Sequence, residues 1–236
     1  MKSALVLGGS SDIGASISKL LLARGWHVFA QGNRWAGRAA QQLFDQPRLK
    51  KFSVDLSKRE EVNHVLQDSP DFLRVDSVIN CVGCWTEGSF EDHPINELEE
   101  SFRINVFHPY LFIRSCIPGM LERNWGRVVQ LSSIGVKFGG AVNTFPYSWS
   151  KHTLEFIPAE FKRWARRNVF YNCVRVGVVD TRIHSSNQKK DMSARIGQIP
   201  IGRMIDKDEI SRAIIWLASE DNEITTGQVI SFSGGE

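Results

Sequence analysis

The chain has 236 residues, of which 42% are hydrophobic and 23% are charged, and its formal net charge is +3. This composition predicts one soluble globular domain with a large core. The small net charge argues against nucleic acid and membrane surfaces as partners. No run of the chain approaches the roughly 18 apolar residues that a membrane-spanning helix needs.

Short apolar runs alternate with longer helical patterns along the whole chain. In chain order, strands are predicted at residues 4–7, 27–31, 50–54, 75–80, 127–131, 169–176 and 228–232. Helices are predicted between them, near residues 13–24, 36–46, 58–67, 95–122, 146–167 and 207–219. This alternation predicts an α/β fold: a doubly wound, Rossmann-like parallel sheet of about seven strands with helices on both faces, in a single domain.

Three places depart from this regular pattern. Pro118 and Pro158 fall inside long helical patterns, and each is predicted to kink or end its helix. The segment 180–200 is rich in Ser, Asn, Lys and Asp and has neither the helical nor the strand period. Because long irregular segments in compact domains are commonly functional, we predict a mobile lid over the substrate near residues 180–200.

A glycine-rich turn, Gly8-Gly-Ser-Ser-Asp-Ile-Gly14, follows the first predicted strand. Gly8 permits a positive φ and Gly14 permits close packing, so that backbone N–H groups and the helix N-terminus face a phosphate. Ser10 and Ser11 add hydroxyl donors. Asp12 is interpreted as the N-cap of the next helix, at a cost to phosphate binding. The turn alone is a weak signal, because an ordinary strand-to-helix turn reads in the same way.

The residues after the second predicted strand indicate the nucleotide. An acidic residue there would bind the ribose 2′-hydroxyl of NAD, but the chain has Gln31-Gly-Asn-Arg34. Arg34 is suited to pair with a 2′-phosphate, and a solvated surface arginine is the alternative. We therefore predict NADP (NADPH) as the cofactor, in preference to NAD. Asp55, after the third strand, either accepts from the adenine amino group or caps the next helix.

A candidate proton donor lies farther along the chain. Tyr147 and Lys151 are four residues apart, so a helix places them on one face. A neighbouring ammonium lowers the pKa of a phenol from about 10, and Tyr147 can then give a proton to a carbonyl oxygen while a hydride reaches the carbon. Ser133, after the fifth strand, can hydrogen-bond that oxygen. Such pairs are mostly structural when alone, but this one shares a predicted sheet edge with the glycine-rich turn and with Asn80-Cys-Val-Gly83.

Together these motifs resemble the short-chain dehydrogenases/reductases of the single-domain type, including 3-oxoacyl-carrier-protein reductase-like members. The resemblance covers nearly the whole chain. It also extends to four further motifs, which are Phe102-Arg-Ile-Asn-Val106, Val176-Gly-Val-Val-Asp-Thr181, Ile201-Gly-Arg203 and Thr226-Gly-Gln-Val229. The sequence departs from the family pattern at Leu7, Asp12 and Val176, where the family has threonine, glycine and proline.

The resemblance implies specific roles within a single dinucleotide-binding and catalytic domain, residues 1–236. The implied catalytic residues are Asn105, Ser133, Tyr147 and Lys151. The implied cofactor-binding residues are Gly8, Ser10, Ser11, Asp12, Ile13, Gly14, Asn33, Arg34, Asp55, Leu56, Asn80, Gly83, Tyr147, Lys151, Gly177, Val179 and Thr181. Tyr147 would be the general acid or base, Lys151 would also bind the nicotinamide ribose, and Asn105 would hold a water that relays protons to Lys151.

Several expectations concern the surroundings of this site. Cys81-Val-Gly-Cys84 lacks a second ligand pair, so we expect packed thiols and no metal. With no export signal, we expect a cytoplasmic protein with reduced cysteines. Basic residues in and near the lid either form a solvated surface or bind an acidic or carrier-bound substrate. They are Lys137, Arg175, Arg182, His184, Lys189, Lys190 and Arg195. A second basic group consists of Arg163, Arg166 and Arg167, and the resemblance implies that these arginines touch an acidic carrier protein if one presents the substrate.

These observations predict an NADP-dependent oxidoreductase that interconverts a small-molecule carbonyl and an alcohol, with Tyr147 as general acid/base. One alternative is a non-catalytic NADP-sensing protein, and another is an NAD-linked alcohol dehydrogenase. The resemblance also implies a homo-oligomer, a tetramer or dimer joined through the predicted helices 95–122 and 146–167. The sequence does not identify the substrate.

Overall fold

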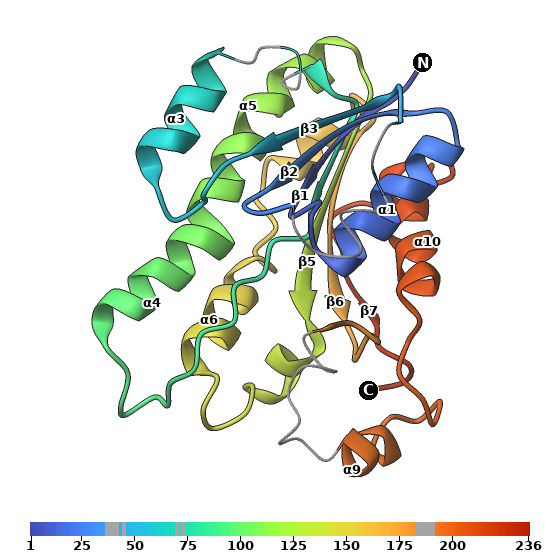
Figure 1. Cartoon of the computed structure of the whole chain (residues 1–236). Helices are drawn as coiled ribbons and strands as arrows, with labels where there is room; N and C mark the ends of the chain where they lie inside the picture. Colours follow the sequence, from blue (N-terminus) through green and yellow to red (C-terminus); the bar gives the residue numbers. More distant parts are fainter. Residues whose placement is uncertain (36–42, 44–45, 69–70, 72–73, 183–191) are drawn as a thin grey trace.

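The computed structural model describes residues 1–35, 43, 46–68, 71, 74–182 and 192–236. Within these residues, seven strands form one parallel sheet in the order β3-β2-β1-β4-β5-β6-β7 (Figure 1). The strands are β1 (Ser3–Leu7), β2 (His27–Gly32), β3 (Leu49–Ser53), β4 (Ser77–Asn80), β5 (Gly126–Ser133), β6 (Val169–Val176) and β7 (Val229–Phe232). The predicted doubly wound parallel sheet is confirmed, and the strand order reverses between β1 and β4.

Helices cover both faces of the sheet (Figure 1). On one face, α1 (Asp12–Ala23) packs beside α10 (Lys207–Ala218). On the other face lie α3 (Arg59–Asp68), α4 (Ile95–Phe102), α5 (His108–Glu122) and α6 (Phe145–Thr153). Shorter elements complete the described part of the chain, and these are η2 (Arg103–Phe107), η3 (Ile134–Phe138), α7 (Phe161–Ala165) and α9 (Met192–Gly197).

The two faces of β1 belong to two separate cores. Val6 packs with the helices α1 and α10, and Leu5 packs with Phe112 and Met120 of α5. Successive side chains of a strand point to opposite faces, so a strand covered on both sides has to be apolar throughout. This explains why Ala4 to Leu7 is entirely apolar and entirely buried.

The long helical patterns are interrupted at partly different places from those that the sequence predicts. The 95–122 pattern contains a π-helical turn, Arg103–Phe107, between α4 and α5. Helix α5 continues through Pro118, so this proline does not end the helix. The 146–167 pattern is two helices, because α6 ends at Thr153 and α7 begins at Phe161, with Pro158 between them as predicted.

Two predicted segments lie partly or wholly outside the described residues. They are the helix at 36–46 and the central part of the lid at 180–200. The described end of the predicted lid contains a short helix, α9, which the sequence pattern did not indicate. Among the described residues, no helix is long and apolar enough to cross a membrane.

Candidate active site

Most of the predicted site residues lie at the carboxyl edge of the sheet. Leu7, which precedes the glycine-rich turn, pairs with Asn80 of β4, and Ser133 of β5 pairs with Val176 of β6. In a doubly wound parallel sheet, this edge and the position where the strand order reverses are where ligands bind. The four strand ends therefore bring the predicted motifs to one place.

The turn after β1 requires both of its predicted glycines. Gly8 has φ +74°, and a Cβ there would lie 3.0 Å from the backbone after β4. A Cβ on Gly14 would lie 2.3 Å from the carbonyl oxygen of Gly8. Buried Gln31 fixes the start of the turn, because its Oε1 accepts from the Gly8 N–H at 2.9 Å. The sequence analysis missed this role of Gln31, although a polar residue near the end of a buried strand was a usable signal.

The N-cap of α1 is Ser11, so the interpretation of Asp12 as the cap is wrong. The Ser11 hydroxyl accepts from the Gly14 N–H at 3.1 Å and donates to the Gly8 carbonyl at 2.7 Å. Asp12 is the first residue inside the helix. Its carboxylate accepts from the backbone N–H of Arg182 at 2.9 Å and from the Arg182 Nε at 3.0 Å. A residue that follows β6 thus pairs with the negative charge at the start of α1.

The turn has donors that a phosphate would satisfy. Among the described residues, the backbone N–H groups of Ser10, Asp12 and Ile13 have no hydrogen-bond partner. They lie at the start of a twelve-residue helix, whose N-terminal dipole favours an anion. The narrow glycine turn and these donors fit the pyrophosphate of a dinucleotide.

The residues predicted to bind adenosine follow β2 and β3. Asn33 and Arg34 are exposed directly after β2. A hydrogen bond from the Ser57 N–H to the Asp55 carboxylate lowers the pKa of Asp55, and the charge of Arg34 contributes to the same shift. Arg34 therefore lies near Asp55, and the Asp55 carboxylate supports the turn before α3. The buried Leu56 follows in that turn.

The candidate proton donor and its serine partner come together as predicted. Ser133, at the end of β5, lies close enough to Tyr147 of α6 for its hydroxyl to act on the pKa of the phenol. Burial raises the pKa of Tyr147, and the interaction with Ser133 partly opposes this rise. The phenol is therefore protonated at neutral pH. The indole of Trp85 lies against the phenol ring, with the ring centroids 4.9 Å apart.

Lys151, one helical turn after Tyr147 in α6, is buried at this edge of the sheet. Its ammonium donates to the carbonyl oxygens of Val82 and Leu131, each at 2.7 Å, and the side chain is buried. Burial lowers the pKa of Lys151 to about 8. The predicted lowering of the Tyr147 pKa by this ammonium is wrong, because burial raises the pKa and the charge of Lys151 is not among the causes of the shift. A Cβ on Gly83 would lie 3.5 Å from the Lys151 Nζ, so the loop after β4 packs on the lysine.

Asn105 is buried in the π-helical turn and holds the loop after β4. Its Oδ1 accepts from the Cys84 N–H at 2.7 Å, and its Nδ2 donates to the Ser150 hydroxyl at 2.9 Å. These bonds link the loop to α6, next to Lys151. Asn80 supports the same loop, because its Oδ1 accepts from the Val82 N–H at 3.1 Å. The proton relay through Asn105 stays a prediction.

The segment after β6 completes the edge of the site. A Cβ on Gly177 would lie 2.5 Å from the Cα of Ser233, so the glycine is required for the close approach of the two segments. Val179 is buried and bridges to Ile205. The Thr181 hydroxyl donates to the Val179 carbonyl at 3.3 Å. The three residues belong to the predicted motif 176–181, which the structure places in the irregular segment directly after β6.

The basic residues around the site are mostly engaged within the protein. Arg175 forms two hydrogen bonds with Glu155, at 2.8 and 2.6 Å, Arg182 pairs with Asp12, and Arg195 pairs with Glu236. Three of the residues suggested for an acidic substrate are therefore neutralised by carboxylates of this chain. Lys137 is exposed over the ring of Phe138, and His184, Lys189 and Lys190 lie outside the described residues.

The cysteines and the arginines in and after α7 have no assigned part in this chemistry. All four cysteines are free, and burial raises the pKa of Cys81 to about 12, as expected for a packed thiol. In the part of the chain that the structure describes, no group of three or more potential ligands could hold a metal ion. Arg167 hydrogen-bonds Asn124 and the carbonyl of Leu121, and a role for Arg163 and Arg166 in carrier binding stays a prediction.

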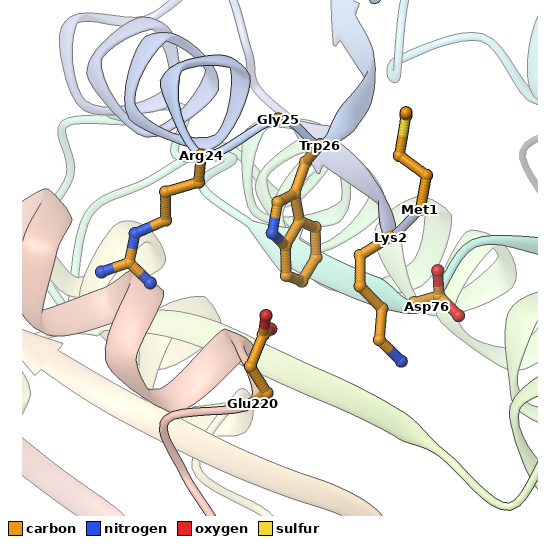
Figure 2. Close-up of a pocket in the computed structure, with 7 residues that line it drawn as sticks. All are labelled: Met1, Lys2, Arg24, Gly25, Trp26, Asp76 and Glu220. Carbon is orange, nitrogen blue, oxygen red and sulfur yellow. The ribbon is translucent and has the colours of Figure 1, made fainter.

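A pocket at the opposite edge of the sheet is distinct from this site. It has a volume of about 400 Å³, and Figure 2 shows the residues that line it. Lys2, Trp26 and Asp76 come from or adjoin the amino ends of β1, β2 and β4. The Lys2 ammonium lies over the ring of Trp125, 3.4 Å from its centroid. Because ligands of doubly wound sheets bind at the carboxyl edge, we do not assign the chemistry to this pocket.

Comparisons with known proteins agree with the arrangement at the carboxyl edge. Residues 8–236 match a protein-family model described as Enoyl-(Acyl carrier protein) reductase. The chain is 31% identical to an acetoacetyl-CoA reductase of Rhizobium meliloti (strain 1021), over 99% of this chain and 97% of the relative. It is 27% identical to the 3-oxoacyl-(acyl-carrier-protein) reductase FabG of Aquifex aeolicus (strain VF5), over 99% and 96%.

A solved structure of similar fold includes a bound dinucleotide. It is a 3-oxoacyl (acyl-carrier-protein) reductase from Agrobacterium tumefaciens C58 with NADP bound. Its TM-score is 0.87 at 25% identity, and the match covers 100% of this chain and 94% of that chain.

Proposed function

The chain belongs to the short-chain dehydrogenase/reductase family of NAD(P)-dependent oxidoreductases, and we propose that it reduces a carbonyl group with NADPH. The observation that carries this proposal is that Ser133, Tyr147 and the buried Lys151 lie at one edge of the sheet, where Ser133 acts on the pKa of Tyr147. These groups lie at the sheet edge that also holds the glycine turn. As the substrate class we propose 3-oxoacyl thioesters, because several similar proteins carry names of reductases for such thioesters.

The residues suit NADP better than NAD. The unpaired donors of the glycine turn would hold the pyrophosphate, and Arg34 would pair with the 2′-phosphate. No acidic residue occupies the four positions from Gln31 to Arg34 that would favour the 2′-hydroxyl of NAD. When bound, NADPH supplies the hydride that reduces the carbonyl carbon.

The protein supplies the proton and the orientation of the substrate. Tyr147 gives its phenolic proton to the carbonyl oxygen, and Ser133 orients that oxygen by hydrogen bonding. Because burial raises the pKa of Tyr147, the phenol carries its proton at neutral pH, which suits an acid in the direction of reduction. The same phenol would act as the base in the direction of oxidation, so the choice between a reductase and an alcohol dehydrogenase rests on the cofactor and the substrate.

Lys151 and Asn105 support the site through the loop after β4. The Lys151 ammonium is held by two backbone carbonyls and places a positive charge at this edge of the sheet. There it would also bind the nicotinamide ribose. Asn105 ties the loop after β4 to α6 and so fixes the carbonyl of Val82 against Lys151. Trp85 forms an apolar wall beside the phenol, which excludes water from one side of the reacting oxygen.

The test is NADPH consumption with acetoacetyl-CoA, the same acyl group on a carrier protein, and a panel of ketones, quinones and sugars. We expect turnover of a thioester with NADPH and weaker use of NADH. Tyr147→Phe is expected to lose at least about 100-fold in kcat while NADPH affinity is kept. NADPH binding without turnover of any substrate would instead favour the sensing protein. A phenylalanine variant with undiminished kcat would refute the assignment of Tyr147.

We also propose that the protein is a homo-oligomer that associates through α4, η2, α5 and α6. Three large side chains of these helices are exposed: Phe107 at 55%, Tyr110 at 53% and Trp149 at 48%. An apolar pocket of about 400 Å³ lies on the same face, between Leu98, Phe102 and Trp149. A second copy would cover these aromatic side chains. Light scattering coupled to size exclusion should give a mass of two or four chains, and a monomer would contradict this proposal.

A further inference from the structure

The negative charge of Asp12 lies at the position where this fold binds a phosphate. Asp12 is the first residue of α1, and its N–H is one of the unpaired donors of the glycine turn. A carboxylate here would repel a pyrophosphate, since two like charges in a partly desolvated site oppose each other. The glycine turn and Asp12 therefore make opposite contributions to cofactor affinity unless the carboxylate is neutralised.

The structure provides a neutralising group from a distant part of the sequence. Arg182 contacts Asp12 through its backbone N–H and through Nε, so the carboxylate accepts both bonds from one residue. The Asp12 side chain is only 14% exposed, whereas that of Arg182 is 52% exposed. The arginine thus covers the carboxylate on the side that faces solvent.

This contact differs from an ordinary surface ion pair in the same helix. At the other end of α1, Arg24 pairs with Asp221 at 2.8 Å, and both side chains are almost half exposed. Such a pair contributes little, because water screens both charges. The pair at the start of α1 is instead asymmetric, with a covered carboxylate next to unpaired backbone donors.

We propose that Arg182 is a positioning residue for the cofactor, which holds and neutralises Asp12 so that a dinucleotide pyrophosphate can bind at the start of α1. The proposal rests on the proposed binding of NADPH. Arg182 acts through Asp12: with the arginine in place, the local charge of the pair is zero and the turn binds an anion. Without the arginine side chain, Asp12 keeps the bond from the backbone N–H of residue 182, but its charge is no longer neutralised and repels the phosphates.

The test is a double-mutant cycle on the affinity for NADPH, measured by fluorescence titration of the purified protein without substrate. Arg182→Ala is expected to raise the NADPH Kd about tenfold, since it exposes one full negative charge next to the phosphates. Asp12→Asn combined with Arg182→Ala is expected to restore the Kd to within about twofold of the wild type. Arg182→Lys, which keeps the positive charge, is expected to recover most of the loss. Arg24→Ala is the matched control and should leave the Kd unchanged.

The outcomes separate this inference from the proposed function. If Arg182→Ala has the same effect in the presence and absence of Asp12→Asn, Arg182 does not act through Asp12 and the inference is overturned. An unchanged Kd in Arg182→Ala also overturns it. A wild-type protein without measurable NADPH affinity would refute the proposed function itself. As a second probe we suggest adenosine 2′-phosphate, which has no pyrophosphate: its affinity should be insensitive to Arg182→Ala, and an equal loss would indicate general damage and overturn the inference.

Discussion

The buried Lys151 predicts an unusual dependence of stability on pH. Burial lowers the pKa of its ammonium from 10.5 to about 8. The unfolded chain keeps the proton up to the ordinary value, so between about pH 8 and 10.5 the unfolded state binds more protons than the folded state. Stability contributed by this group therefore rises with pH in that window. Below about pH 8 both states are charged, and the folded state carries the full cost of burying the charge.

The size of the Lys151 contribution to stability follows from the difference between the pKa of 10.5 in the unfolded chain and that of about 8 in the folded protein. At neutral pH the buried charge costs about 3 kcal/mol relative to the neutral amine, since each unit corresponds to about 1.4 kcal/mol. At about pH 9.5 this cost has fallen to roughly 1.4 kcal/mol, so the contribution of Lys151 changes by about 2 kcal/mol. The effect is large enough to measure in a protein of ordinary stability.

The assay is urea denaturation of the protein without cofactor at several pH values, compared with Lys151→Met. The comparison is necessary because burial also raises the pKa of other groups to about 12, and these are Cys81, Cys116, Cys173 and Tyr171. Those groups lower stability at high pH in both proteins and cancel in the difference. The hydrogen bonds that the variant loses add an offset that does not depend on pH.

We expect the free energy of unfolding of the wild type, relative to that of Lys151→Met, to rise by about 2 kcal/mol between about pH 7 and 9.5. Replacement of the exposed Lys19 by methionine is the matched control, and it should keep the wild-type pH dependence. Parallel curves for wild type and Lys151→Met would refute the reasoning, because they would mean that the Lys151 ammonium is not destabilised by burial.

Two further predictions concern stability near the site and are measured as melting temperatures. Arg175→Ala leaves the buried Glu155 without its ion-pair partner and is expected to cost about 3 kcal/mol, or roughly 6–12 °C, whereas the exposed Arg24→Ala should cost less than about 1 kcal/mol. Gly14→Ala places a Cβ 2.3 Å from a backbone oxygen and is expected to cost at least about 2 kcal/mol, whereas Gly197→Ala, with no atom within 4 Å, should be neutral.

Each pair of variants in these two predictions has its own contradicting result. If Arg175→Ala melts no lower than Arg24→Ala, the ion pair with Glu155 is not a buried, mutually dependent pair. If Gly14→Ala and Gly197→Ala have the same melting temperature, the turn after β1 accommodates a side chain and its narrowness does not limit stability.

The strands and the site edge were predictable because their signals are local. Apolar runs bounded by glycine or polar residues located every strand to within a few residues, and the parallel alternation then required one common edge. Tyr147 and Lys151 needed only the helical spacing of four residues. The bends of the long helices were less predictable, because the π-helical turn around Asn105 is stabilised by contacts with Cys84 and Ser150, which are distant in sequence.

The charges around the site could not be assigned from sequence for the same reason. Arg182 and Arg175 look like free surface cations in the sequence, and their partners, Asp12 and Glu155, are 170 and 20 residues away. The direction of the Tyr147 pKa shift was also mispredicted, because the sequence reveals a lysine four residues away but not the burial that raises the pKa. Contacts of this kind depend on packing and appear only in the folded chain.

The strand order also has a consequence for how the protein is made. β1 is central in the sheet, between β2, which follows it closely, and β4, which comes about seventy residues later in the chain. While the ribosome is still synthesising the segment that leads to β4, one edge of β1 in the nascent chain has no partner strand, and the side chains of β1 are apolar. We expect this interval to be when the polypeptide is most prone to aggregate, and a holdase chaperone that binds the first eighty residues would protect it.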